Sequence, residues 1–423
     1  MIKLPACHRP LALAPSPAFT CIASALAVAV ACPAPALAQD HHADIHPEDA
    51  GEIVVVGHPP TDFGLLASAV SLEGDDLVAR MQGQVGEMLA RLPGVSATSF
   101  APGVSRPVLR GFDGDRIRVL VDGIGSIDAS NVSADHAVVF DALTVDHIDV
   151  VHGPAVLLFG GQAIGGAVNA LDKRIPRSVP DAPQITAIGT LGSAARERSL
   201  GGSVQVPLAP RLVIHADATW RKSGNLRVGG RIASHSLRAD LLADAAAHRA
   251  EGEVDEAAEL EALAGLRGTL PNSATRSTTL GAGIAFIDAG GNLGVSIQHT
   301  DSRYGVPGRP GAGHGHAEEG AETADDAGHG EAPVTIGLVQ TRIDLRGAVH
   351  MGGFFDALQF RGAYGDYRHT EFEGADVGTR FFGKGFEFRA DLVQSNRGAW
   401  RGRSGIQLQS RKLASVGPAA SPP

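Results

Sequence analysis

The chain contains little cysteine and few aromatic residues. Of its 423 residues only three are cysteine, and Cys7, Cys21 and Cys32 all lie within the first 38 positions. The rest of the chain has no thiol, so it needs no disulfide and offers no cysteine for metal binding or catalysis. Aromatic residues make up 5% of the chain, which argues against a large aromatic-lined cavity for a bulky organic ligand.

The sequence also lacks an excess of positive charge and any recognisable catalytic motif. After position 38 it has 34 basic and 46 acidic residues, a net charge of −12. This balance argues against nucleic acid or anionic lipid as a partner and favours the attraction of cations. No nucleotide-binding loop, nucleophile–base pair or carboxylate pair stands in a recognisable setting, so we do not expect an enzyme.

The first 38 residues have the pattern of a secretory signal peptide. Lys3 and Arg9 form a basic start, residues 19–31 are apolar and uncharged, and Ala36-Leu37-Ala38 is a cleavage site of the A-x-A type. A membrane anchor is disfavoured because the apolar run is short and prolines follow it. A lipoprotein site with Cys32 acylated is the less favoured alternative.

Residues 92–174 carry the most informative pattern. Short β-rich runs at 116–121 and 147–151 are separated by Gly, Pro and Asp turns. The pieces LPGV (92–95), LRGF (109–112), RVLVDG (118–123), HGP (152–154), GG (160–161) and GGAVN (165–169) occur in order. Together they resemble the plug domain of TonB-dependent outer-membrane receptors, which implies an α+β plug over residues 61–176. The alternative is a soluble α+β domain.

The tail at 39–60 contains a short β-branched segment that resembles a TonB box. Its residues are Glu52, Ile53, Val54, Val55 and Val56. Such a segment can add as a strand to a partner through backbone hydrogen bonds. The resemblance implies that this partner is TonB with its inner-membrane energising complex.

From residue 177 to 423 the sequence alternates with period two, as strands do that face lipid on one side and a polar lumen on the other. We predict about nine strands near 184–192, 197–206, 211–222, 275–287, 292–303, 334–351, 355–372, 379–395 and 399–410. Residues 227–272 are expected to form a loop with a helical stretch at 241–266. The fold class is therefore mainly β, a plug followed by part of a transmembrane antiparallel barrel in Gram-negative outer-membrane lipid.

A barrel wide enough for a plug has about 22 strands. Residues 177–423 are too few for 22 strands and two long loops, and the Pro- and Ala-rich end does not resemble a terminal barrel strand. We therefore expect the strand-forming sequence to be lost near Arg411 and the barrel to be incomplete.

Within the receptor superfamily, the zinc-uptake group is the most similar. The resemblance is carried by DGDRIRVL (113–120), SADHAV (133–138), YGVPG (304–308) and YRHTEFEG (367–374). It implies that Asp135 and His136 bind the transported ion, with Zn²⁺ as the expected ion and His369 and Glu371 as further candidate ligands. The loop at 306–333 adds His314, His316 and His329 among carboxylates, a set suited to weak capture of Zn²⁺, Cu²⁺ or Ni²⁺. No resident cofactor is expected. The alternatives without metal binding are that Asp135 caps a turn and His136 is a polar surface residue, and that the loop at 306–333 is a solvated acidic loop.

The resemblance further implies that the plug arginine Arg110 pairs with the barrel residue Glu387. A second plug arginine of the family is His152 here, which cannot form the bidentate contacts of a guanidinium. Two other functions stay open: a receptor for a metal chelate such as a siderophore or haem, and a surface metal binder that does not transport.

Overall fold

The computed structural model describes residues 68–98, 100–308, 333–395 and 402–417. The chain divides into two compact units, residues 1–57 and 58–423, and every described residue belongs to the second. The predicted signal peptide, the TonB-box-like segment at 52–56 and the loop histidines His314, His316 and His329 lie outside the described residues.

The plug is built on a five-stranded sheet with the order β1-β6-β7-β4-β5. These strands are β1 (Ser68–Glu73), β4 (Ile117–Val121), β5 (Ile124–Gly125), β6 (Val145–His152) and β7 (Gly166–Asp172). Strands β4 and β7 run parallel and the other pairs are antiparallel. All seven residues of the central strand β7 are buried, because both faces of the sheet are covered.

Helices and short strands complete the plug. They are α2 (Gly74–Arg80), α3 (Val85–Leu89), β2 (Val95–Ala97) and β3 (Pro107–Leu109), with 3₁₀ turns at Gly114–Arg116 and Gly153–Phe159. One face of the sheet and the helices share a core that includes Leu77, Met88, Ile148 and Val168. The predicted α+β character of the plug agrees with this arrangement.

A two-residue turn joins β4 to β5. Its residues Asp122 and Gly123 have φ angles of 50° and 82°, and Val121 pairs with Ile124 on either side of them. Two positive φ angles are typical of a type I′ turn, which Asp-Gly adopts readily because glycine has no Cβ to clash. At this turn the Asp122 carboxylate pairs with Arg346 at 2.9 Å.

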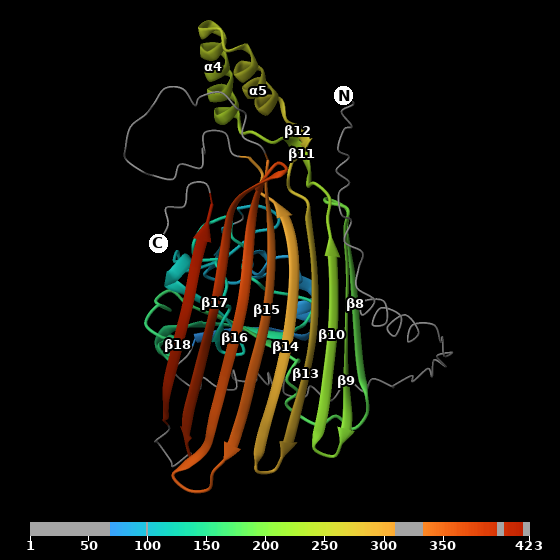
Figure 1. Ribbon diagram of the computed structural model, residues 1–423, viewed down its shortest axis with the longest axis vertical. Coiled ribbons are helices and arrows are strands. Elements are labelled where there is room, and N and C mark those ends of the chain that lie inside the picture. The colour runs from blue at the N-terminus through green and yellow to red at the C-terminus, as the bar shows by residue number, and fades with distance from the viewer. Residues whose placement is uncertain (1–67, 99, 309–332, 396–401, 418–423) are drawn as a thin grey trace, which may run out of the picture. The chain divides into compact units, whose positions relative to one another are not determined.

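The second part of the molecule is a nine-stranded antiparallel meander, in which strands adjacent in the sheet follow one another along the chain (Figure 1). The strands are β8 (Gln184–Gly192), β9 (Glu197–Ala209), β10 (Leu212–Lys222), β13 (Thr275–Asp288), β14 (Gly291–Gly305), β15 (Val334–His350), β16 (Phe355–Glu373), β17 (Asp376–Gln394) and β18 (Arg403–Val416). All nine predicted strands are present. The last one extends to Val416, beyond the predicted limit at residue 410.

The long connection between β10 and β13 contains two helices where a single helical stretch is predicted. They are α4 (His235–Glu251) and α5 (Val254–Gly265), flanked by the two-stranded ladder β11 (Arg227–Arg231) and β12 (Arg267–Thr269). Gly252 ends α4 in the left-handed conformation, with φ 93°, so the chain reverses there. Of the helices in the described segments, none has both the length and the apolar character needed to cross a membrane.

The meander is polar on the face that meets the plug and apolar on the other. In β14, Val295 and Ile297 are 42% and 49% exposed, whereas the intervening Ser296 and the next inward residue, Gln298, are buried. A soluble sheet of two faces would bury the apolar one. The reversed polarity is the one expected of strands that face lipid.

Arg174, two residues after the end of β7, connects the plug to the meander. Its guanidinium donates from Nε and Nη2 to the Asp217 carboxylate at 3.0 and 2.9 Å, and from Nη1 to Asp172 at 2.9 Å and Gln298 at 3.1 Å. A Cβ at Gly281 would lie 2.4 Å from Arg174 Nε, so the glycine makes room for this contact. Buried charges of this kind are stable only when every partner is present.

We expect Arg174→Gln to lower the free energy of unfolding by about 3–5 kcal/mol, because it leaves the Asp217 carboxylate buried without its cation. Denaturant unfolding in detergent, followed by far-ultraviolet circular dichroism, measures this. The control is Arg211→Gln, since Arg211 is 64% exposed and 3.5 Å from Asp288, and it should cost less than about 1 kcal/mol. Equal losses in the two variants would contradict the role of Arg174.

Candidate metal centre

The far end of β16 presents two metal-ligating side chains on its plug-facing side. His369 is fully buried and the Glu371 side chain is 20% exposed, and the two alternate with the outward Arg368 and Thr370. His369 Nε2 lies 3.4 Å from Glu371 Oε1. On the other side of its ring, His369 Nδ1 hydrogen-bonds the Tyr367 hydroxyl at 3.1 Å. Because side chains alternate between the two faces of a strand, Tyr367, His369 and Glu371 all point toward the plug side of β16.

His136 reaches the same space from the plug. Its segment lies between β5 and β6, and its side chain is 1% exposed. Nε2 lies 3.2 Å from Glu371 Oε1, and Nδ1 lies 3.0 Å from the carbonyl oxygen of Ala129. When Nδ1–H donates to that carbonyl, Nε2 carries the lone pair and faces the cluster, the arrangement that second-shell contacts impose on metal-binding histidines.

The ligand atoms of the three residues are spaced as those around a tetrahedral zinc ion. One ligand atom each from His136, His369 and Glu371 lie within 4.8 Å of one another. Two ligands bound tetrahedrally at about 2.0–2.1 Å from zinc are roughly 3.3 Å apart. The 3.2 and 3.4 Å separations from Glu371 Oε1 fit that spacing, so the set can hold either a proton or a metal ion.

The electrostatics of His136 favour a bound cation. Burial by itself lowers the pKa of His136, but the hydrogen bond to Glu371 and the negative charge of Asp135 outweigh it, and the pKa is raised. The pocket therefore stabilises positive charge on or beside the imidazole. Because zinc needs the neutral ring, metal binding at this centre displaces a proton.

Asp135, predicted as a ligand together with His136, is not in the three-residue set. Its carboxylate accepts a hydrogen bond from the Ser133 hydroxyl, and it is not among the groups whose ligand atoms lie within 4.8 Å of one another. The Asp135 carbonyl instead accepts from the Tyr304 hydroxyl at 3.0 Å, and that hydroxyl accepts from the Ala137 N–H at 3.0 Å. Tyr304, on β14, thus holds the backbone on both sides of His136.

Aromatic packing surrounds the two imidazoles. The His136 and His369 rings lie 4.1 Å apart between centroids. The edge of Phe381, on β17, approaches them at 5.0 and 5.4 Å. Tyr304 begins the YGVPG motif at 304–308, but its contact with the segment around His136 could not be read from that motif, and no sequence pattern marked Phe381 as part of the centre. Their apolar rings keep water from the buried side of the ligands, which strengthens electrostatic interactions there.

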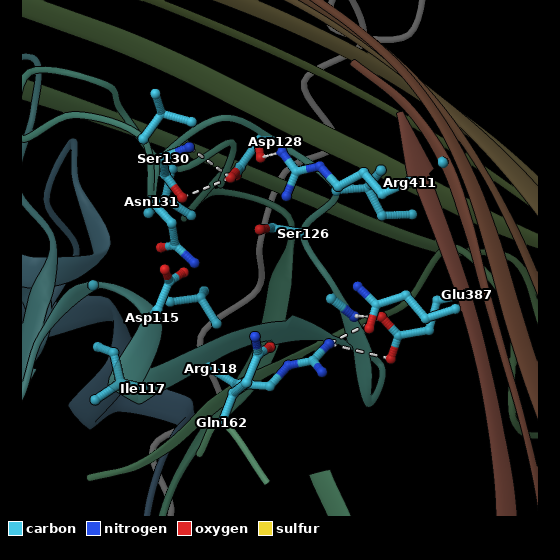
Figure 2. A pocket seen from close by; sticks show the side chains of 18 of the residues that line it. Asp115, Ile117, Arg118, Ser126, Asp128, Ser130, Asn131, Gln162, Glu387 and Arg411 are labelled. Carbon is cyan, nitrogen blue, oxygen red and sulfur yellow. Dashed lines mark hydrogen bonds and ion pairs between the residues drawn. The ribbon is translucent and has the colours of Figure 1, made fainter. Parts of the chain in front are cut away.

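The predicted pairing of Arg110 with Glu387 is corrected by the structure. Glu387 pairs with Arg118, whose Nη2 donates to both carboxylate oxygens at 2.9 and 3.2 Å (Figure 2). The Gly125 N–H and Gln407 also donate to Glu387, at 3.2 and 2.7 Å. Arg110 sits in a tight turn with φ 51° and is exposed, whereas Glu387 is 2% exposed.

Two neighbouring contacts complete this side of the plug. Arg411 of β18 donates to the carbonyl of Asp128 across the pocket in Figure 2. His152, which replaces the second expected arginine, is buried, and burial together with the charge of Arg110 lowers its pKa. A neutral His152 is consistent with its predicted inability to act as a guanidinium.

Arg118→Gln should destabilise the chain by about 3–5 kcal/mol, because it leaves the buried Glu387 carboxylate without its cation. Arg110→Gln removes an exposed charge and should change stability by less than about 0.5 kcal/mol. Denaturant unfolding of both variants, with limited trypsin digestion of the plug as a second readout, tests the assignment. A larger loss for Arg110→Gln would restore the original pairing.

Comparisons with known proteins agree with the plug and the meander. A family model described as "TonB-dependent Receptor Plug Domain" matches residues 64–167. The hemin receptor of Yersinia pestis is 26% identical over 153 residues, which make up 34% of this chain and 22% of that protein. The vitamin B12 transporter BtuB of Vibrio cholerae is 29% identical over 153 residues, 36% of this chain and 25% of that protein.

A solved structure extends the likeness to the strands. The copper transporter OprC superposes with a TM-score of 0.60 at 13% identity, covering 83% of this chain and 47% of that one. The present chain therefore spans about half the length of that transporter, and at this identity the likeness concerns the fold. Residues 64–167 are thus a TonB-dependent receptor plug domain, and with the barrel-like meander that follows they make the chain a Gram-negative outer-membrane protein with the fold of TonB-dependent receptors.

Proposed function

We propose that the chain is the plug-bearing part of a TonB-dependent receptor for a transition-metal ion, with zinc as the first candidate. The observation that carries the proposal is the convergence of His136, His369 and Glu371 within 4.8 Å. Two imidazoles and a carboxylate form a set of borderline and hard donors that suits Zn²⁺. The ion is cargo here, to be bound and then released.

An incomplete ligand set supports transport over permanent storage. Zinc in structural sites usually has four protein ligands, whereas this cluster supplies three. Water or the nearby Asp135 can take the fourth position. The set is also buried at one side and open at the other, since Glu371 is 20% exposed while His369 is fully buried, which leaves a route for exchange.

The division of the ligands between two bodies supports a mechanism of release. His136 belongs to the plug, and His369 and Glu371 belong to β16. A displacement of the plug separates the imidazole of His136 from the other two donors. Since a zinc ion held by two ligands is bound far more weakly than one held by three, a pull on the plug would free the ion.

We infer that TonB and its inner-membrane complex supply this pull through Glu52, Ile53, Val54, Val55 and Val56, pairing by strand addition. The histidines His314, His316 and His329, in a loop with many carboxylates, would capture ions weakly and outside the buried centre. Both segments lie outside the described residues, so these assignments rest on the sequence pattern alone.

A metal chelate is the second candidate cargo, and a cavity favours it. The space between the plug and strands β8 to β14 has a volume of about 670 Å³ and is bounded by Tyr304 and Ala137, next to the metal centre. That volume is within the range of small-molecule sites. The likeness to a hemin receptor points the same way. The low aromatic content, 5% of the chain, favours the bare ion.

His136→Ala and Glu371→Gln should each weaken Zn²⁺ binding by more than about 100-fold, because each removes a direct ligand. Isothermal titration of the chain in detergent, with a competing chelator, measures the affinity. His299→Ala is the matched control, since His299 is an exposed histidine whose ring contacts Thr341, and it should leave the tight site unchanged. Tight binding of hemin or a ferric siderophore without tight Zn²⁺ binding would favour the second candidate.

Tyr304→Phe should weaken Zn²⁺ binding by about 10–100-fold, the usual cost of losing an outer-shell partner of a ligand. The change removes the hydroxyl that holds Asp135 and Ala137 around His136 but preserves the ring. The same titration checks it, with Tyr364→Phe as the control, because Tyr364 is 43% exposed on the opposite face. Unchanged affinity in Tyr304→Phe would show that the plug segment holds His136 without this clamp.

A further inference from the structure

We propose that His248, Glu251 and Glu253 form a second divalent-metal site, at the tip of the hairpin made by α4 and α5. One ligand atom from each of these residues lies within 4.8 Å of the others. The set shares no residue with the buried centre, and the metal affinity proposed for it does not depend on that centre.

The hairpin connection brings the three side chains together. Gly252 donates its N–H to the carbonyl of Arg249, and Glu253 donates its N–H to the carbonyl of His248 at 2.9 Å. This reversal folds Glu253 back against the last turn of α4. Glu251 is three residues after His248, so the two occupy the same face of the helix. The local backbone thus gathers one imidazole and two carboxylates.

The rest of the hairpin holds this tip in place. Leu241 and Ala245 of α4 and Ala257 and Ala264 of α5 are buried. Arg249 Nη1 bridges the two helices by donating to Glu261 Oε1 at 2.5 Å. At the start of α4, the Ser234 hydroxyl accepts from the Leu237 N–H at 3.2 Å, a capping contact that stabilises the first turn.

The chemistry of the tip suits a cation that exchanges readily. His248 Nδ1 and Glu253 Oε2 are 2.5 Å apart, and both side chains are about two-fifths exposed, at 40% and 42%. Zinc ligands need about 3.3 Å between them, and exposed side chains can open by rotation. Three ligands leave at least one position for water, so we expect weak, reversible binding of Zn²⁺, Mn²⁺ or a similar ion.

The charge around the tip points to a cation as well. Residues 235–265 contain eight acidic and two basic residues. Glu251 and Glu253, with Asp255 and Glu256 close behind them in sequence, crowd negative charge at the turn, which is unfavourable without a counter-charge. A divalent ion relieves this repulsion more effectively than the single imidazole can, and a negative hairpin raises the local concentration of cations.

The place of the hairpin gives the site a role that rests on the proposed function. The hairpin connects the last residue of β10 to the first residue of β13. These residues lie at the same end of the meander's strands as the last residues of β16 (Figure 1). Thr275 pairs with Tyr304 at this end, and Thr335 pairs with Phe372, next to Glu371. An ion released from the hairpin is therefore set free at the end of the strands where the buried centre lies, and the hairpin would supply ions to that centre.

The test is zinc protection of His248 from modification by diethylpyrocarbonate, read at the level of the peptide by mass spectrometry. In the full chain in detergent, Zn²⁺ should protect His248. The double variant Glu251→Gln/Glu253→Gln should need at least about tenfold more Zn²⁺ for the same protection, a loss of at least about 1.4 kcal/mol. Within the same sample, the exposed His299 is an internal control and its modification should not depend on zinc.

Two further variants make the result decisive. Arg249→Gln/Glu261→Gln breaks the neighbouring exposed ion pair without touching a ligand. It should keep the protection, because the buried residues of α4 and α5 still hold the hairpin together. His136→Ala disables the buried centre, and protection of His248 should persist there, so failure of one site is distinguishable from failure of the other. His248 modified equally with and without Zn²⁺, or protected equally in the Glu251→Gln/Glu253→Gln variant, would overturn the proposal and leave a surface ion pair only.

Discussion

The structure depends on the neutralisation of buried charges between the plug and the polar face of the meander. Arg174 with Asp217, and Arg118 with Glu387, are ion pairs whose side chains are almost wholly buried, and Asp122 is held by both Arg177 and Arg346. Each charge would be costly in a low-dielectric interior without its partner. Most inward residues of the meander are polar, and its apolar contacts with the plug are confined to small clusters such as Ala129 and Val139 with Leu338, so charge pairing supplies much of the interface.

A largely polar interface of this kind would suit the plug movement that the proposed function requires. Hydrophobic contact between two bodies is lost only by exposing apolar surface to water, whereas ion pairs and hydrogen bonds can be exchanged for contacts with water at a smaller net cost. The candidate metal centre follows the same principle. His136 from one body and Glu371 from the other are joined by a single 3.2 Å contact, so the centre is assembled or divided by the position of the plug.

In the metal centre, period-two alternation predicts the faces of the strand residues but not the directions of the loop residues. Alternation along 367–374 places His369 and Glu371 on one face, and the structure has them there. It cannot indicate the direction of a side chain in an irregular loop, and Asp135 turned out to bind Ser133. Likewise the motif around Arg110 does not reveal that this residue is exposed in the turn at Leu109–Phe112. Arg118 occupies an ordinary strand position, and the sequence offers no mark that separates it from its neighbours.

The sequence by itself determined the approximate positions of the nine meander strands and, where period two is regular, the face on which a residue lies, because these follow from local alternation. The plug was identified from its resemblance to a known domain. The last strand extends to Val416 since pairing with β17 stabilises residues whose own composition is unfavourable. Only the tertiary structure decided which charges pair and which ligands meet. His136 and Glu371 are 235 residues apart, and their contact depends on the register of every intervening strand and on the seating of the plug, which no local pattern encodes.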